Sequence, residues 1–252
     1  MQAFIGHSDI HCQLSRGDLR QAQSARHGGE MSKSKPKGRP YKTEAEQEEV
    51  RSRILDATAA AYAETGYHGL SVQAILDKAE ISRPTFYRYF SNVDEPAKLM
   101  IIRAHKSLGD RLANEVPTDV TLEERMSAAI DIYLDWGKSI GPLVRPFYIE
   151  LHDPYSPVAA LRQDILARIG RMYTKIVEQY GRQIKNRLLV DVMQTGNEFV
   201  GYRYHIETNR DAESLAMTRD AMIRLMANTF PDPEEWLKHF TQDGQLKPKS
   251  RR

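Results

Sequence analysis

Hydrophobic positions recur every three or four residues along most of the chain between residues 43 and 229, and this spacing predicts amphipathic helices. Residues 43–46 (TEAE) have the spacing of a capping box, which marks a helix start. Gly66 interrupts the pattern. We therefore expect a helix from Thr43 to about residue 64, with an apolar stripe made of Val50, Ile54, Ala57, Ala61 and Tyr62.

Two shorter helices are predicted next, one on each side of a tight turn. Ser71 is placed to cap residues 72–79, whose apolar positions are spaced for one helix face. Ser82 can cap the following helix, and Pro84 lies in its first turn, where the missing N–H breaks no hydrogen bond. Two short helices joined by a tight turn are typical of a helix-turn-helix.

The second of these helices has two chemically different faces. Phe86 and Phe90 fall on one face together with Ile81, and they can anchor the helix to its predecessors. The opposite face carries groups that can donate hydrogen bonds to phosphate oxygens or base edges. Its residues are Pro84, Thr85, Tyr87 and Arg88.

Further helical segments follow, and no alternating segment of convincing length predicts a strand. They cover about residues 92–116, 121–140, 143–152, 157–180, 184–207 and 211–229. The expected fold class is all-α, with an N-terminal three-helix domain that contains the helix-turn-helix and a larger helical domain after it. The expected division is a basic, disordered arm (1–42), the helix-turn-helix domain (43–92), the larger domain (93–230) and a C-terminal tail (231–252).

The charge is unevenly distributed. The net charge is +2, but residues 1–42 carry eight Lys or Arg against three acids, or 8 − 3 = +5, which leaves 28 − 31 = −3 for the rest. A basic arm can replace counterions along a phosphate backbone, although a solubilising tail has the same composition. Lys37 and Arg39 could enter a minor groove or belong to an unstructured linker. Met31 is a possible start, so no function is placed on residues 1–30.

Composition narrows the class of protein. With 252 residues, 40% of them hydrophobic, the chain can bury a substantial core. The single cysteine, Cys12, excludes an intramolecular disulfide and a cysteine-based zinc site. No apolar run approaches the length of a membrane span or resembles a signal peptide, so we expect an intracellular protein.

The helix-turn-helix region resembles the DNA-binding domain of TetR-type bacterial transcriptional regulators. The resemblance is carried by residues 67–72 (YHGLSV), 75–79 (ILDKA), 81–82 (IS) and 85–90 (TFYRYF). It implies a bacterial, cytoplasmic protein with a DNA-binding head and a helical body that dimerises and binds a small effector. Glu80 stands where the family usually has glycine in the turn.

The resemblance also implies roles for individual residues. Arg83 and Pro84 match positions that reach base edges, whereas Thr85, Tyr87 and Arg88 match positions that contact the DNA backbone. The candidate DNA-binding residues are Ser71, Ser82, Arg83, Pro84, Thr85, Tyr87, Arg88, Lys37 and Arg39.

The expected partners are a double-stranded DNA operator, a second copy of the chain and a small-molecule effector, without cofactor, metal or membrane. Candidate effector-pocket residues are Tyr133, Trp136, Phe147, Tyr148, His152 and Tyr173, although each could be an ordinary core or surface aromatic. Candidate dimer-interface residues are Leu188, Leu189, Val192, Met193, Phe199, Val200, Leu215, Met222, Leu225 and Met226, with burial inside one subunit as the alternative.

The sequence bears on three classes of function. An enzyme is disfavoured because the sequence has no Gly-rich phosphate loop, no His-Glu-x-x-His and no nucleophile elbow. The prediction is a ligand-responsive repressor that binds a palindromic operator as a dimer. The alternative is a helical dimer whose head has become a protein-interaction module, which Glu80, Val93 and Asp94 favour because they are acidic or apolar where cations would help.

Overall fold

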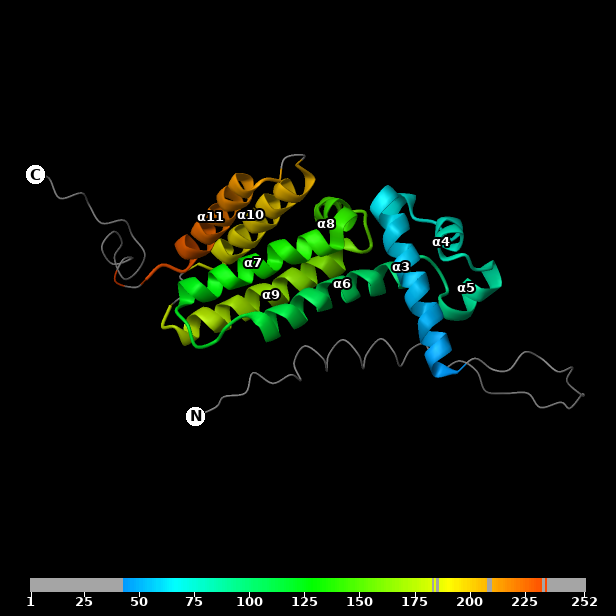
Figure 1. Ribbon diagram of the computed structural model, residues 1–252, viewed down its shortest axis with the longest axis horizontal. Coiled ribbons are helices and arrows are strands. Elements are labelled where there is room, and N and C mark those ends of the chain that lie inside the picture. Colours follow the sequence, from blue (N-terminus) through cyan, green and yellow to red (C-terminus); the bar gives the residue numbers. More distant parts are fainter. Residues whose placement is uncertain (1–42, 183, 185, 208–209, 233, 235–252) are drawn as a thin grey trace, which may run out of the picture. The chain divides into compact units, whose positions relative to one another are not determined.

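The computed structural model describes residues 43–182, 184, 186–207, 210–232 and 234, and these residues form helices, turns and connecting segments without a strand (Figure 1). The chain divides after Lys42 into two units, and only the second contains described residues. The predicted arm, which includes Lys37 and Arg39, therefore lies outside the described residues, as does most of the predicted tail. The prediction of an all-α chain is confirmed.

The helix-turn-helix consists of α4 (Val72–Ala79) and α5 (Arg83–Tyr89), which follow the longer α3 (Glu44–Gly69). The capping box at the start of α3 forms as predicted, because the Thr43 N–H donates to Glu46 Oε2 at 2.7 Å and the Glu46 N–H donates to Thr43 Oγ1 at 3.2 Å. Gly66 adopts φ 66°, which interrupts the regular helix. Three further residues continue α3 beyond this kink, so the helix ends later than the sequence predicts.

The core of the helix-turn-helix region joins all three helices. Tyr62 from α3, Ile75 from α4 and Phe86 from α5 are completely buried, and Phe90 is nearly so. Removing an aromatic or aliphatic side chain of this size from water contributes roughly 1.5–3 kcal/mol. The two phenylalanines therefore hold α5 against its predecessors and leave its opposite face free.

The larger domain contains the remaining helices, and its second core cluster lies between α7, α9, α10 and α11. α10 packs against α11, α7, α8 and α9, while α6 packs against α7 and α3. Its elements are α6 (Asp94–Glu115), α7 (Leu122–Ile140), the 3₁₀ helix η1 (Gly141–Leu143), α8 (Val144–Leu151), α9 (Ala159–Gln179), α10 (Arg187–Ile206) and α11 (Ala212–Thr229).

The end of α3 is tied to both α6 and α8 through Tyr67. The Tyr67 N–H donates to Glu150 Oε1 on α8 at 2.9 Å, and the Tyr67 hydroxyl donates to Asp94 Oδ1 at the start of α6 at 2.5 Å. His68 Nε2 also lies 2.6 Å from Asp153 Oδ2, just beyond α8. The kink in α3 thus connects the helix-turn-helix region to the larger domain.

No helix in the described part of the chain is long and apolar enough to cross a membrane.

Candidate nucleic-acid interface and body cavity

The exposed face of α5 presents the polar groups that the sequence places there. Ser82, Arg83, Pro84, Tyr87 and Arg88 are exposed, with half of the Tyr87 surface open to solvent. Thr85, which the sequence places on the same face, is half-buried. Its hydroxyl lies 2.9 Å from the Ser82 hydroxyl. Ser82 also caps α5, because its Oγ accepts the N–H of the third helical residue. Ser71 caps α4 in the same way through the Ala74 N–H at 3.1 Å.

Arg83 does not extend freely from the start of α5. Its Nη2 donates to Gln73 Oε1 on α4 at 2.9 Å, and Gln73 Nε2 donates to Asp77 Oδ1 at 2.7 Å. Gln73 therefore holds the guanidinium across the two helices of the motif. Sequence reasoning did not select Gln73, although it lies two residues after the capping Ser71 on an exposed position of α4.

The turn between α4 and α5 contains a strained residue. Glu80 has φ 51° and ψ 46°, and it is the one non-glycine residue with positive φ in the described part of the chain. This left-handed conformation is unfavourable for a residue with a Cβ. The turn nevertheless closes, since the Ile81 N–H donates to the Leu76 carbonyl at 3.3 Å. The helix-turn-helix geometry therefore forms without the glycine that the family usually has there.

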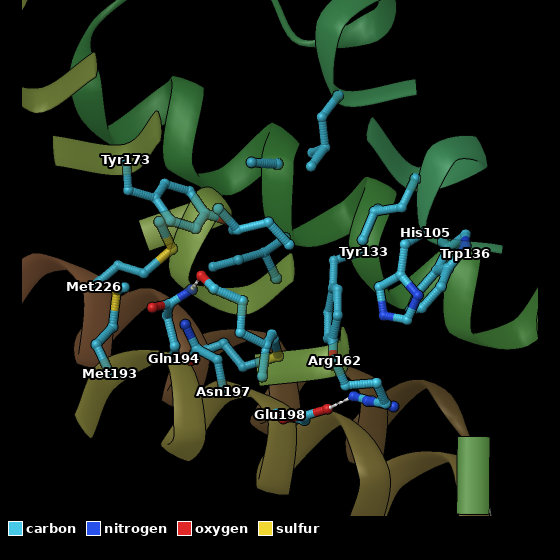
Figure 2. A pocket seen from close by; sticks show the side chains of 17 residues that line it. His105, Tyr133, Trp136, Arg162, Tyr173, Met193, Gln194, Asn197, Glu198 and Met226 are labelled. Carbon is cyan, nitrogen blue, oxygen red and sulfur yellow. Dashed lines mark hydrogen bonds and ion pairs between the residues drawn. The ribbon is translucent and has the colours of Figure 1, made fainter. Parts of the chain in front are cut away.

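A second candidate site is a cavity of about 80 Å³ inside the larger domain, between α6, α7, α9, α10 and α11 (Figure 2). Tyr133, Trp136 and Tyr173, three of the predicted effector residues, line it. The Tyr133 ring reaches α10 at Gly201, where a Cβ would lie only 2.8 Å from its Cε1. Figure 2 shows Tyr133 and Trp136 beside His105 at one end and Tyr173 beside Met226 at the other.

The other three predicted pocket residues do not line this cavity, because they lie on or next to α8. Phe147 is buried behind the cavity, where its ring stacks on His105 at a centroid distance of 5.4 Å. Tyr148 stacks on Tyr202 of α10 at 4.2 Å, and His152 meets the Tyr148 ring edge at 5.2 Å. An aromatic residue can be recognised from sequence, but the direction of its ring depends on the packing of α8.

The cavity also has a polar wall that sequence reasoning missed. Arg162 is only 2% exposed, forms an ion pair with Glu198, and holds its guanidinium 5.0 Å from the centroid of the Phe147 ring. Arg162 Nε and Nη1, Glu198 Oε2 and Asn197 Oδ1 are buried and have no hydrogen-bond partner among the described residues. Burial raises the pKa of the Glu198 carboxyl, and the neighbouring Arg162 opposes that rise.

His105 is neutral where it borders the cavity. Burial and then the positive charge of Arg162 lower its pKa to about 3. Its Nδ1 lies 2.9 Å from the Ile101 carbonyl oxygen, which can only accept, so Nδ1 carries the proton and Nε2 is left as an acceptor. Burial likewise raises the pKa of Tyr173 to about 12, which keeps its phenol protonated.

The predicted dimer residues separate into two groups. Leu188, Leu189, Val192, Phe199 and Leu215 are exposed on α10 and α11, whereas Val200 and Leu225 are half-buried. Met193, Met222 and Met226 are at most 2% exposed and line the cavity, so they are corrected from interface residues to interior residues of one protomer.

No group of three or more His, Cys, Asp or Glu within the described ranges could hold a metal ion.

The architecture is that of helix-turn-helix proteins in which a small three-helix domain precedes a larger helical domain. Residues 54–95 match the family described as "Bacterial regulatory proteins, tetR family". A solved structure of a TetR-like transcriptional regulator from Rhodococcus has a TM-score of 0.58 at 21% identity, over 74% of this chain and 96% of that one. The helix-turn-helix region of the chain therefore matches the TetR family, and the whole chain shares its fold with a TetR-like regulator.

Two curated relatives match shorter segments. The HTH-type transcriptional activator FasR of Mycolicibacterium smegmatis is 26% identical over 90 residues, which cover 36% of this chain and 41% of that protein. The HTH-type transcriptional repressor KstR of Mycobacterium tuberculosis is 46% identical over 44 residues, which cover 18% of this chain and 20% of that protein. The chain thus matches less than half the length of these relatives.

Proposed function

We propose that this protein is a transcriptional regulator that binds a palindromic DNA operator as a homodimer and responds to a small-molecule effector. The observation that carries the proposal is the exposed face of α5, where Arg83, Tyr87 and Arg88 lie opposite the buried Phe86. The match of residues 54–95 to the TetR family supports it, as do relatives named as a transcriptional activator and a transcriptional repressor.

The residues of α5 would have different roles in DNA binding. Arg83, at the N-terminal end of the helix, can reach guanine O6 and N7 with two hydrogen bonds after leaving Gln73. Tyr87 and Arg88 would contact phosphates, which fix the position of the helix without reading sequence. Ser71 offers an exposed hydroxyl at the start of α4 for a further phosphate contact.

The exposed apolar side chains of α10 and α11 support the homodimer. A single seven-residue recognition helix makes few base contacts, so two copies give the specificity that a regulator needs. A two-fold axis through α10 and α11 would bury the exposed leucines together with Val192 and Phe199. The two heads would then read two halves of a palindrome.

Selection of bound duplexes from a random pool tests the DNA-binding function. We expect one palindromic sequence to be enriched. Arg83→Ala should lose about 1–3 kcal/mol on that operator and little on an operator already changed at the contacted base pair. Tyr87→Phe should weaken all sequences by a similar factor, because a phosphate contact carries no base preference.

Arg171→Ala is the matched control, since it removes an exposed arginine from α9 and leaves the helix-turn-helix intact. If no sequence is enriched and binding to random DNA is indifferent to Arg88→Ala, which would remove a phosphate contact, the regulator proposal fails. The protein-interaction module would then be the better assignment, favoured by the exposed acid Glu80 in the turn.

A further inference from the structure

The cavity in the larger domain has one apolar side and one polar side. Its apolar lining comes from Leu108, Leu112, Ile130, Leu166 and the cavity methionines. Its polar lining comes from Arg162, Gln194, Asn197 and Glu198, which lie along α9 and α10 (Figure 2). A cavity with this division accepts a ligand that is apolar over most of its surface and polar at one end.

The polar side has hydrogen-bonding capacity that the protein does not use. Gln194 is partly satisfied, because its Nε2 donates to the Leu166 carbonyl at 2.8 Å. By contrast, Arg162 keeps two donor nitrogens, Nε and Nη1, without partners among the described residues. Asn197 Oδ1 and Glu198 Oε2 are unpartnered acceptors in the same part of the chain. Buried polar groups are almost always hydrogen-bonded, so these four atoms indicate a place for a ligand that both accepts and donates.

The charges that line the cavity sum to zero. Arg162 and Glu198 form an ion pair, the other lining residues carry no formal charge, and His105 is neutral. A charged ligand would bring a buried charge without a counter-charge, whereas a neutral ligand would not. The electrostatics of the cavity therefore disfavour both carboxylates and amines.

We infer that the cavity binds a small neutral molecule with an apolar ring or short alkyl chain and one head group that both donates and accepts hydrogen bonds. A primary carboxamide is the simplest such head group. The cavity of about 80 Å³ is smaller than the engineered cavity of about 150 Å³ that holds benzene. Met193, Met222 and Met226 can make room, because methionine side chains repack easily. This ligand class rests on the proposed function only for its role as an effector.

Four probes of similar shape test the inference: benzamide, benzoate, benzylammonium and toluene. Titrations of the full chain at pH 7.5, followed by calorimetry or ligand-observed NMR, give the four affinities. We expect benzamide to bind at least tenfold more tightly than benzoate or benzylammonium, and more tightly than toluene. A wild-type protein that binds benzoate more tightly than benzamide, or none of the four probes, would overturn the inference.

Two variants locate the binding and test its electrostatic cause. Glu198→Gln leaves Arg162 as an unpaired cation, so benzoate should gain at least tenfold in affinity while benzamide changes little. Asn197→Leu keeps the charge at zero and removes a hydrogen-bonding group, so benzamide should lose affinity while toluene does not. Glu178→Gln makes the same chemical change as Glu198→Gln at an exposed position of α9 and should alter none of the affinities.

The outcomes separate this inference from the proposed function. Thermal unfolding and circular dichroism of each variant establish that it is folded, and the wild-type ranking of the probes stands without any variant. If no operator is selected but benzamide is still preferred, the ligand class holds and the role in regulation falls. If an operator is selected but Glu198→Gln does not change the preference for benzoate, the site is wrong and the regulator proposal is untouched.

Discussion

Glu80 is the residue at which the backbone of the helix-turn-helix is most strained. A left-handed conformation costs a residue with a Cβ about 1–2 kcal/mol, and a glycine there costs about 0.5–1 kcal/mol in unfolded-chain entropy. Because the Glu80 side chain is exposed, its removal loses no core packing. Glu80→Gly should therefore raise the free energy of unfolding by about 0.5–1 kcal/mol, measured by urea denaturation. An equal gain from Glu80→Ala would show that the carboxylate, not the backbone, is responsible.

His105 should make the stability of the protein depend on pH. Its folded pKa of about 3 lies below the ordinary histidine value of 6.5. Between these values the unfolded chain binds a proton that the folded chain does not, so stability is complete above pH 6.5 and falls as the pH drops toward 3. The loss can reach about 1.4 kcal/mol per pH unit.

Urea denaturation at pH 7.5, 6.0 and 5.0 tests this pH dependence. His105→Gln should show a shallower loss of stability than the wild type across that series, because glutamine does not titrate. His152→Gln, at an exposed position, controls for the change of residue type. Parallel curves for His105→Gln and the wild type would contradict the assignment of the pH dependence to His105.

Single residues also show why the polar wall of the cavity was not predicted. Arg162 and Glu198 are 36 positions apart on different helices, and each alone resembles an ordinary surface charge. Only the packing of α9 against α10 brings them together inside the protein. The residues of α5 were predictable because seven consecutive helical positions determine both the buried and the exposed face.

Among the elements, α8 is placed to connect the cavity to the helix-turn-helix region. Phe147 on α8 lies under the Arg162 guanidinium, and Glu150, one turn later, accepts the Tyr67 N–H at the kink of α3. Glu150 is buried, so its hydrogen bond is shielded from water. We therefore predict that a ligand that moves Arg162 displaces α8 and, through Glu150, the end of α3.

Glu150→Ala should weaken this connection while α5 keeps its contacts with DNA. We expect the ratio of operator affinities with and without an effector to shrink by several-fold, with operator affinity itself changed less; fluorescence anisotropy measures both. Asp153→Ala is the matched control, because the pair of His68 and Asp153 spans the same elements at the surface and contributes little. The effector and the operator must change each other's affinity by the same factor, so the ratio measures the coupling between the two sites. An unchanged ratio in Glu150→Ala would show that this coupling does not pass through Glu150.

The starts of helices were the most predictable property of the elements. The capping box predicted at Thr43 forms, and a second one is present at Thr121. Asn92 Oδ1 accepts the N–H groups of Asp94 and Glu95 at the start of α6. Local hydrogen bonds of this kind depend on neighbouring residues only. The apolar stripes that include Met193 on α10 and Met222 on α11 were harder to assign, because helical spacing predicts burial but not the partner that provides it.

For the whole molecule, the exposed apolar side chains of α10 and α11 predict a homodimer. Leu188 is 63% exposed and Val192 is 55% exposed, which is unusual for neighbouring apolar residues on one helix. A two-fold axis brings each such residue near its own copy or a close neighbour, so an added charge is repelled by its counterpart. Val192→Asp should therefore weaken the dimer at least tenfold, and operator affinity should fall with it.

Analytical ultracentrifugation between 0.1 and about 50 μM measures this equilibrium, with wild-type protein expected near twice 28.9 kDa at the upper end. Tyr155→Asp is the matched control, because Tyr155 is an exposed aromatic residue outside α10 and α11, and its replacement should leave the dimer intact. The loss of operator affinity in Val192→Asp should diminish as protein concentration rises, since mass action restores the dimer. A wild-type mass of 28.9 kDa at every concentration, with and without operator, would mean that the exposed face of α10 serves another partner.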